Sequence, residues 1–369
     1  MVQRGGAGSG SGVFRMTIAV IAVVTAVGAV EAALRAHDRV DFTARNYVAD
    51  RLSLRAAGYP ASHDPLLGHV PVPGYEAMAN PWNLRVSIDD ASLRQNAAGQ
   101  PTPAPVAVVA VGGSDTFGEE VIDRETWPAQ LQSMLGQPVA NGGVFGYGLD
   151  QAVLRAEAIV PRLRPWALVV SFVHDDALAT EAAQRAGTEK PYFEVADGAL
   201  ALRNVPVSAN RPRVAQIGMI RTMLGYSYLV DWAARQVGAS GWWYAPGSPQ
   251  VRLHSDGPQV ACLLMRRLKD VGDASGARVL VVAQYPPRTF ATPGDPSARA
   301  GIGGSARILT CAHDAGLETL DTLPALQERH RASPATFFGQ YFARSHMSAA
   351  GNRLVAERVA DTLAGMPGG

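Results

Sequence analysis

Apolar residues in the second two thirds of the chain fall into short, nearly continuous runs. Five such runs, rich in valine, isoleucine and leucine, predict strands at residues 106–111, 139–140, 166–172, 278–283 and 317–320. Apolar residues at helical spacing predict helices at residues 127–135, 149–160, 259–271, 306–315 and 349–363. Strands that are apolar on both faces are typical of parallel sheets covered by helices on each side. The pattern therefore predicts a three-layer α/β/α domain around a parallel sheet.

The interval from about residue 177 to residue 257 is too long for a simple crossover between two of these strands. Asp197-Gly198 lies between two alternating runs within residues 191–207, which predicts a β-hairpin. Residues 219–236 have a helical pattern, and we expect exposed aromatic residues nearby at Trp242, Trp243 and Tyr244. An insertion beside the carboxyl ends of the strands is expected to form a lid or a wall of the substrate site.

The N-terminus carries an uninterrupted apolar run over residues 16–30, preceded by Arg4 and Arg15. Its length falls short of the ~20 residues that span a bilayer fully. The run fits either the core of a cleaved signal peptide or an uncleaved signal-anchor, and we prefer the anchor because Val30 and Glu31 interrupt the small residues of a cleavage site. Arginines before the run place the N-terminus inside the cytoplasm and the bulk of the chain outside. We therefore expect a single-pass membrane protein with its main domain on the periplasmic side.

The region between this run and the first predicted strand has a mixed pattern. A helix is expected to continue from residue 38 to about residue 55, a loop rich in proline and glycine follows at residues 63–75, and residues 84–96 predict short strands or a hairpin. Residues 97–105 resemble a linker. The predicted organisation is a leader and anchor at residues 1–37, an extension and linker at 38–105, and the α/β domain at 106–369.

Composition excludes some function classes. The chain has 33 basic and 32 acidic residues, a formal charge of +1, so there is no electrostatic case for nucleic-acid binding. The eight histidines are scattered without metal-ligand spacing, and no metal or cofactor is expected. Cys262 and Cys311 are either a disulfide formed in an oxidising compartment or two buried free thiols, and we prefer the free thiols.

The stretch VGGSDTFG places Ser114 directly after the first predicted strand of the sheet and before a helix. A serine at this turn is either an exposed nucleophile or an ordinary N-cap of the helix. The G-x-S-x-G elbow of α/β-hydrolases is not satisfied, because Thr116 stands where its second glycine belongs. No Gly-Lys-Ser/Thr follows, so a phosphate-binding loop is also excluded.

Three further polar segments follow predicted strands or precede the last helix. The first is NGGVFGYGLDQ at residues 141–151, whose glycines either let backbone N–H groups approach a ligand or simply allow positive φ angles. Its glycine order is not the dinucleotide fingerprint. The second, SFVHDDAL, contains His174, Asp175 and Asp176, and the third, SHMSAAGN, contains His346. Ligands of open parallel sheets bind beyond the carboxyl ends of the strands, so these segments are candidates for one site.

The order of these segments resembles the SGNH (GDSL-type) hydrolase family over roughly residues 106–363. GGSDTFG looks like its first block, G-D-S-x-x-x-G, with Gly113 in the place of the aspartate and Ser114 in the place of the nucleophile. Gly146 matches the glycine that donates its N–H to the oxyanion, and His346 matches the general base. Residues 64–74 look like the lead-in of membrane-anchored members.

The resemblance implies a flavodoxin-like parallel sheet and the activity of a serine ester hydrolase or O-acyl transferase. An acylated carbohydrate or cell-envelope polymer is the implied substrate, with lipid esters second, and no cofactor is implied. The rival hypothesis is a catalytically silent module of the same fold that binds glycan or takes part in an envelope assembly.

Two positions depart from the family pattern. The third block, G-x-N-D, supplies an asparagine to the oxyanion hole, and here Asp175 or, with a shift by one, His174 takes that place. Asp175 can donate only if protonated, which burial beside Asp176 would favour, whereas His174 is a donor in its own right. The family's aspartate before the histidine is also missing, because Ala343 and Arg344 stand there. Asp321, Asp175 or Asp176 is expected to replace this acid, unless a carbonyl orients the imidazole.

Overall fold

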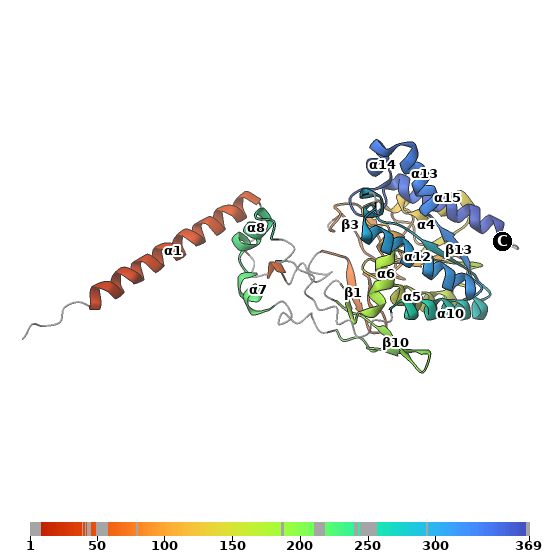
Figure 1. The fold of residues 1–369 in the computed structure, drawn as a ribbon, viewed down its shortest axis with the longest axis horizontal. Coiled ribbons are helices and arrows are strands. Elements are labelled where there is room, and N and C mark those ends of the chain that lie inside the picture. The colour runs from red at the N-terminus through yellow and green to blue at the C-terminus, as the bar shows by residue number, and fades with distance from the viewer. Residues whose placement is uncertain are drawn as a thin grey trace, which may run out of the picture. The chain divides into compact units, whose positions relative to one another are not determined.

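The chain folds into two compact units, which we describe separately. The first consists of Met1–Leu52 and Arg213–Gly247, and the second of Ser53–Pro212 and Ser248–Gly369. The structure, a computed structural model, describes residues 9–38, 40, 42, 46–48, 58–78, 80–185, 188–209, 218–239, 243, 257–292 and 294–366 (Figure 1). The predicted extension at residues 38–105 is thus divided between the two units. Residues 38–52 belong to the first unit, and residues 53–105 belong to the second.

A five-stranded parallel sheet forms the centre of the second unit, in the order β13-β12-β7-β5-β6. Its strands are β5 Val108–Gly112, β6 Val139–Asn141, β7 Ala167–Phe172, β12 Arg278–Ala283 and β13 Glu318–Asp321. Val108 pairs with Val139 on one side and with Ala167 on the other. Numbered along the chain, the order reads 2-1-3-4-5, the doubly wound arrangement of flavodoxin-like folds. The predicted parallel sheet is therefore confirmed, strand for strand.

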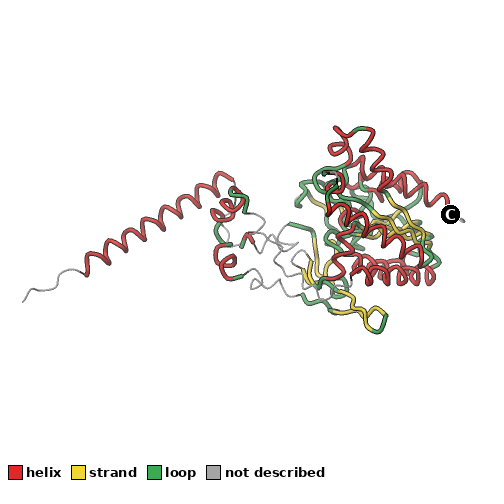
Figure 2. Tube along the Cα trace, in the orientation of Figure 1, coloured by secondary structure: helices red, strands yellow, loops and turns green. Residues whose placement is uncertain are grey.

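Alternate residues of each strand enter separate apolar cores on the two faces of this sheet. Val109 and Val111 of β5 pack in the core that is covered by α5, α10 and α12, whereas Val108 and Ala110 pack with residues of α4 and α15. Figure 2 shows the yellow strands between these red helices. Burial on both faces explains why the strands are apolar without alternation. The predicted three layers are confirmed.

The helices agree with the predictions closely, with one exception. The main ones are α4 Trp127–Leu135, α5 Leu149–Leu163, α10 Gly257–Ser275, α12 Pro296–Asp314 and α15 Ala349–Gly365. Helix α12 begins ten residues before the predicted start, because Asp295 caps it by accepting a hydrogen bond from the Ser297 N–H at 2.9 Å, and a proline follows at the first position. Glycines in its first half had hidden this start.

Short elements complete the second unit. Its remaining helical segments are α3 Ser114–Phe117, α6 His174–Leu178, α11 Arg288–Ala291, α13 Leu323–Ala332, α14 Pro334–Tyr341 and the 3₁₀ turns Asp123–Glu125 and Ala179–Glu181. Antiparallel pairs are formed by β1 Ala61–Asp64 with β2 Gly68–Pro71, β3 Glu76–Ala77 with β4 Val86–Ser87, and β8 Gln184–Arg185 with β9 Thr188–Glu189.

The predicted hairpin within residues 191–207 is present as β10 Tyr192–Ala196 paired with β11 Ala199–Arg203. Its turn residues Asp197 and Gly198 have φ angles of 51° and 78°. Positive φ at both positions is what a two-residue type I′ turn requires, and Asp-Gly tolerates it better than most pairs.

Cys262 of α10 and Cys311 of α12 form a disulfide, with their Cα atoms 5.1 Å apart. The preference for two free thiols was wrong. The two helices pack side by side on one face of the sheet, which brings together cysteines that are 49 residues apart in sequence. Such proximity depends on the tertiary arrangement and has no local signature in the sequence.

The first unit contains the long helix α1 Ser9–Asp38, and α7 Met219–Leu224 and α8 Tyr228–Gln236. Within α1, Phe14–Asp38 is long and apolar enough to cross a membrane, a property that a signal sequence shares. The helix ends at Asp38. Of the predicted continuation to residue 55, residues 40, 42 and 46 are not helical, Tyr47 and Val48 are helical, and the other residues lie outside the described part.

Of the predicted insertion at residues 177–257, residues 213–247 belong to this first unit, and the remainder, with the β10–β11 hairpin, belongs to the second. The predicted exposure of Trp243 was wrong, because its side chain is fully buried and its Nε1–H donates to Asp231 at 3.0 Å. Trp242 and Tyr244 lie outside the described residues.

Candidate active site

Ser114 is the first residue of α3, immediately beyond the carboxyl end of β5. Gly113 occupies the N-cap position, so the alternative reading of Ser114 as the N-cap was wrong. Helix α3 ends after one turn at Gly118, whose φ of 85° places it in the left-handed region. A first helical residue has an N–H without an intrahelical acceptor, and its side chain points away from the strand that precedes it.

His346 lies on the loop before α15, and its Nε2 atom is 2.9 Å from the Ser114 Oγ. The two residues are 232 positions apart in sequence and meet because both follow elements at the carboxyl edge of the sheet. The imidazole side chain is 18% exposed, which leaves one edge open to solvent. This geometry allows the Ser114 hydroxyl to donate to a neutral imidazole.

A carboxylate that the sequence analysis did not select, Glu120, lies at the other ring nitrogen of His346. The distance from His346 Nδ1 to Glu120 Oε1 is 3.5 Å. The hydroxyl of Ser345 lies between the two groups, 3.1 Å from Nδ1, and donates to Glu120 Oε1 at 2.9 Å. Glu120 thus orients the ring both directly and through Ser345.

Glu120 is also bound to the backbone that carries the histidine. Its Oε2 atom accepts hydrogen bonds from the N–H groups of Arg344 at 2.8 Å, Ser345 at 3.0 Å and His346 at 3.3 Å. Glu120 itself has a φ of 68°, an uncommon conformation for a residue other than glycine, asparagine or aspartate. Strain of this kind persists only where the surroundings enforce it, and it is concentrated at functional sites.

Charged groups of the site shift the pKa values of His346 and Glu120. Burial favours the neutral imidazole, but Glu120, Asp115 and Glu119 outweigh it and raise the pKa of His346 to about 9. Burial alone would raise the pKa of Glu120, yet its hydrogen bonds with His346, Arg344 and Ser345 hold that pKa well below the usual range. The resting site therefore contains an imidazolium paired with a carboxylate.

A second carboxylate, Glu119, faces the same imidazole from the Nε2 side, at 3.9 Å. It is buried and accepts a hydrogen bond from the Trp82 Nε1–H at 3.1 Å. Burial is the main reason that its pKa is raised, to about 6, and His346 opposes this shift. Glu119 lies on the Nε2 side of the imidazole, where Ser114 is, and not at Nδ1. Its contribution is therefore its negative charge, and it does not orient the ring.

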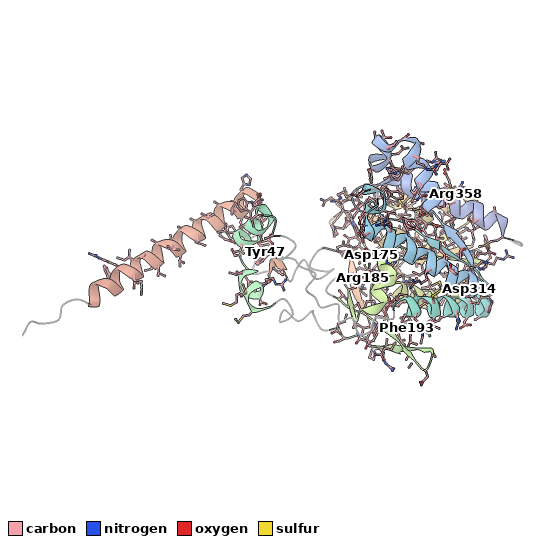
Figure 3. All side chains as sticks on the ribbon, viewed as in Figure 1. Tyr47, Asp175, Arg185, Phe193, Asp314 and Arg358 are labelled. Carbon is pink, nitrogen blue, oxygen red and sulfur yellow. A yellow bond between two sulfur atoms is a disulfide. The ribbon has the colours of Figure 1, made fainter. Side chains whose placement is uncertain are left out.

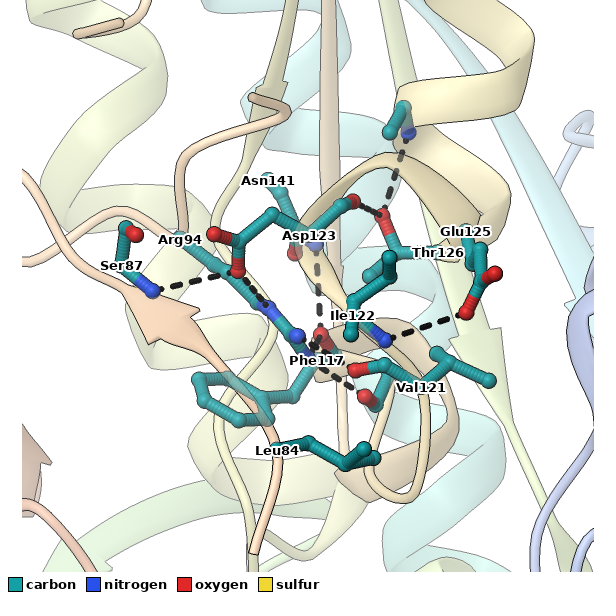
Figure 4. A network of polar contacts seen from close by, with 12 residues as sticks. Leu84, Ser87, Arg94, Phe117, Val121, Ile122, Asp123, Glu125, Thr126 and Asn141 are labelled. Carbon is teal, nitrogen blue, oxygen red and sulfur yellow. Dashed lines mark hydrogen bonds and ion pairs between the residues drawn. The ribbon is translucent and has the colours of Figure 1, made fainter. Parts of the chain in front are cut away.

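Arg94 holds the loop that carries both glutamates. Its guanidinium is fully buried and donates to the carbonyl groups of Phe117 at 2.8 Å, Gly118, and Val121 at 2.7 Å (Figure 4). Its Nε–H donates to Asp123 Oδ1 at 3.2 Å. The planar, multidentate guanidinium thus ties both ends of the segment that contains Glu119 and Glu120.

Replacing Arg94 by methionine is expected to destabilise the protein by ~3–5 kcal/mol, since it leaves Asp123 as an unpaired buried charge and three carbonyls without their donor. Urea unfolding followed by circular dichroism measures this loss. The control is Arg353→Met on α15, whose side chain is 67% exposed beside Glu357, and which should change stability by about 0.5 kcal/mol or less. A loss at Arg94 as small as that of the control would contradict the role of this network.

Gly146 lies on the loop that follows β6, which packs directly against α3. Gly146 has a φ of 72° and follows Phe145, whose carbonyl accepts a hydrogen bond from His69 Nε2 at 2.9 Å. A Cβ atom at Gly143 would lie 2.3 Å from the Phe117 nitrogen, so glycine permits this close packing. The glycines of the loop therefore serve its contact with the serine helix as well as its turns.

The predicted replacements for the missing acid lie elsewhere. Asp176 is buried; its Oδ2 accepts from the Val173 N–H at 3.1 Å, and its Oδ1 accepts from Arg185 at 3.0 Å. Burial raises its pKa to about 6. Asp321 accepts a hydrogen bond from the N–H of Leu323, the first residue of α13, at 2.9 Å. The carboxylate beside His346 is that of Glu120 instead.

Asp176 also lies directly against Gly113. A Cβ atom at position 113 would lie 3.0 Å from Asp176 Oδ2. The carboxylate of Asp176 therefore occupies the space in front of residue 113, and a second carboxylate there would be repelled.

The two candidates for the third oxyanion donor differ in their surroundings. Asp175 is labelled in Figure 3. Its side chain is half exposed, and it accepts a hydrogen bond from Arg288 at 2.6 Å, so it is paired with a cation and is not placed as a donor. The burial that was expected of Asp175 is contradicted by this exposure. Burial lowers the pKa of His174, which favours its neutral form. Among the contacts that the described residues make, none joins His174 to Ser114.

A cavity of about 470 Å³ opens at the carboxyl ends of β7 and β12. Polar side chains from both loops line it, among them His174, Asp175, Gln284, Tyr285 and Arg288. Gln284 is buried, and its Nε2 donates to Ser171 at 2.6 Å. The cavity lies at the edge of the sheet where ligands of open α/β folds bind.

Of the residues selected from the sequence, the structure brings Ser114 and His346 together, and it adds Glu119, Glu120 and Arg94, which the sequence analysis did not select. One signal was present: two glutamates directly follow the glycine that ends the serine motif. The sequence around the two glutamates does not distinguish them from two solvent-exposed glutamates, because their burial depends on Arg94 and Trp82 from the N-terminal extension.

No family model matches the chain, and no curated protein sequence matches it. Solved structures similar to it include a lipolytic protein of the G-D-S-L family from Desulfitobacterium hafniense (12% identity, 70% of this chain and 99% of that chain, TM-score 0.38). Others are the acetyl xylan esterase AlAXEase (11% identity, 70% and 100%, TM-score 0.42) and the acetylxylan esterase Axe2 from Geobacillus stearothermophilus (13% identity, 72% and 96%, TM-score 0.41). Several of the solved structures to which this chain is similar are thus GDSL-type lipolytic proteins or acetyl xylan esterases.

Proposed function

We propose that this protein is a serine ester hydrolase or O-acyl transferase with Ser114 as nucleophile. The observation that carries the proposal is the array of Ser114 Oγ, His346 and Glu120, in which the imidazole contacts the hydroxyl through Nε2 and a carboxylate through Nδ1. Nucleophile, base and orienting acid in this relation activate a serine hydroxyl on unrelated folds.

The reaction begins when His346 is neutral. Ser114 Oγ attacks the ester carbonyl carbon, and its proton passes to Nε2 of His346. Glu120 stabilises the imidazolium that forms and keeps the ring in the tautomer with a proton on Nδ1. The imidazolium then donates its Nε2 proton to the leaving alcohol as the C–O bond breaks, which leaves an acyl group on Ser114. Water, or a sugar hydroxyl in a transferase, attacks this acyl-enzyme and restores the serine.

The N–H groups of Ser114 and Gly146 are the proposed donors to the oxyanion. Helix α3 begins at Ser114, and the loop of Gly146 packs against that helix, which supports this assignment. His174 is the proposed third donor, since Asp175 is engaged by Arg288. Each donor of this kind contributes on the order of 10²–10³ to the rate.

The proposed substrate is an acylated carbohydrate or cell-envelope polymer, with lipid esters as the second choice. The resemblance of the four sequence blocks implies this class.

The catalytic unit is proposed to lie outside the cytoplasm, anchored by α1. The disulfide between Cys262 and Cys311 supports this placement, because structural disulfides persist in oxidising compartments. The apolar part of α1, fully exposed in the first unit, supports a membrane anchor.

A fluorophosphonate probe tests the proposal, since an activated serine displaces its fluoride and becomes covalently labelled. We expect one label per chain on the purified protein, located at Ser114 by peptide mass spectrometry. Absence of labelling on folded protein would favour the silent glycan-binding module. A charged, membrane-impermeant probe applied to spheroplasts should label Ser114 without lysis; labelling only after lysis would place the domain in the cytoplasm.

A further inference from the structure

Helix α7 presents an apolar face to solvent within the first unit. Met219, Ile220, Met223 and Leu224 are 77%, 62%, 70% and 43% exposed, and Tyr226 directly after them is 50% exposed. The four aliphatic positions are spaced i, i+1, i+4 and i+5, so they share one side of the helix. A contiguous apolar face of this kind marks an interaction surface.

The other side of α7 is bound to the body of the unit, which fixes the direction in which the apolar face points. Asn46 Nδ2 donates to the Thr222 carbonyl at 2.7 Å, and the Tyr47 N–H donates to the Gly225 carbonyl at 2.7 Å. A Cβ atom at Gly225 would lie 2.4 Å from Asn46 Oδ1, so the two segments are in close contact. The exposed residues therefore cannot turn inward while these contacts hold.

The chain that follows α7 is anchored on α1 at Glu31. The Glu31 carboxylate accepts hydrogen bonds from the N–H groups of Tyr228 at 2.8 Å and Leu229 at 2.7 Å and from the Ser227 hydroxyl at 2.9 Å. It thereby caps the first turn of α8, which Figure 1 shows beside the C-terminal end of α1. An ionised carboxylate with its polar partners does not enter hydrocarbon, so Glu31 marks the level at which the bilayer core ends.

The apolar part of α1 below this level is short. Residues 16–30 span roughly 22 Å at ~1.5 Å per residue, against ~30 Å for a typical hydrocarbon core. Such a mismatch is relieved by thinning of the bilayer or by additional apolar groups at the interface. Helix α7 ends three residues before the Ser227 that Glu31 binds, so its apolar face lies close to that interface.

We propose that α7 is a second membrane contact, with Met219, Ile220, Met223 and Leu224 inserted into the outer face of the bilayer that α1 crosses. Tyr226 then lies at the headgroup level, where its ring is apolar and its hydroxyl is hydrated. Amphipathic helices that lie in the interface bury one apolar face in this way. The inference rests on the membrane anchoring by α1 in the proposed function, and it gives the segment at residues 213–247 the role of a membrane-binding module.

Site-directed spin labelling of the full chain tests this contact. Because both native cysteines are in the disulfide, each single cysteine variant offers one free thiol to a nitroxide reagent. The variants are Met223→Cys on α7, Val23→Cys on α1 and, as the aqueous control, Arg353→Cys on α15. In phosphatidylcholine–phosphatidylglycerol vesicles, we expect labels at 223 and 23 to be relaxed by oxygen more than by a water-soluble nickel chelate. The label at 353 should show the opposite preference.

The outcomes separate the two hypotheses. A label at 23 in lipid together with a label at 223 as accessible to nickel as that at 353 overturns the α7 contact alone. A label at 223 shielded from both reagents also overturns it and indicates a protein covering. A label at 23 accessible to nickel overturns the membrane anchor itself, whatever position 223 shows.

Discussion

Replacing Ser114 by alanine is expected to lower kcat for an activated ester such as p-nitrophenyl acetate by a factor on the order of 10⁵–10⁶. The hydroxyl is the attacking group, and the oxyanion donors alone retain only a small acceleration over water. The initial rate of p-nitrophenol release, corrected for buffer hydrolysis, measures the loss. Thermal unfolding should change little, because Ser114 contributes one hydrogen bond to His346.

The double variant Ser114→Ala/Glu120→Gln tests whether Ser114 and Glu120 act as one catalytic unit. If Glu120 acts only through His346 on Ser114, removing it after the nucleophile is gone should lower the rate by no more than about threefold, since residues that act as one unit are not additive. A residual rate above 1% in Ser114→Ala would show that a different group attacks the ester.

Replacing Glu120 by glutamine alone is expected to lower the plateau value of kcat/KM by roughly 10³- to 10⁴-fold, the cost of removing the acid that orients a catalytic histidine. Glutamine keeps an oxygen for the N–H groups of Arg344 and Ser345 but loses the charge that stabilises the imidazolium. The control is Asp321→Asn, the acid considered from the sequence, which should leave kcat/KM within about threefold. Equal losses in both variants would contradict the assignment of Glu120.

The pH dependence of kcat/KM distinguishes this role from a structural one. Neutral His346 is the base, so activity rises with pH through its pKa, which is about 9 in the wild type. Carboxylates raise that pKa, and Glu120→Gln removes one of them, so the rising limb should move toward lower pH and the ordinary value of ~6.5. A lower plateau with an unmoved limb would show that Glu120 only maintains the loop.

The fold could be predicted from the sequence because its signal is local. Each strand of the sheet is buried on both faces, so its residues form a continuous apolar run in the sequence. The helix at Trp127–Leu135 is likewise marked by its N-cap residue and by the helical spacing of its apolar residues. Ser114 and His346 could be selected from the sequence because their neighbours carry recognisable motifs, and the structure places them in contact.

The missing acid could not be found in this way. Glu120 reaches His346 because Arg94, some twenty-six residues earlier, holds the loop between Phe117 and Val121, and because Glu120 itself adopts a positive φ. Neither condition has a pattern in the sequence. The disulfide was missed for the same reason, since only the packing of α10 against α12 brings Cys262 and Cys311 together.

The placement of Glu120 changes which positions selection must preserve. The proposed nucleophile and acid, Ser114 and Glu120, are six residues apart in sequence, so we expect them to be conserved together, and Ala343 and Arg344 before the histidine carry no acid. Arg344, whose side chain is 67% exposed, is then free to vary in homologues. We expect a glutamate at position 120 to covary with arginine at 94, and chains that regain an aspartate before the histidine to have lost both.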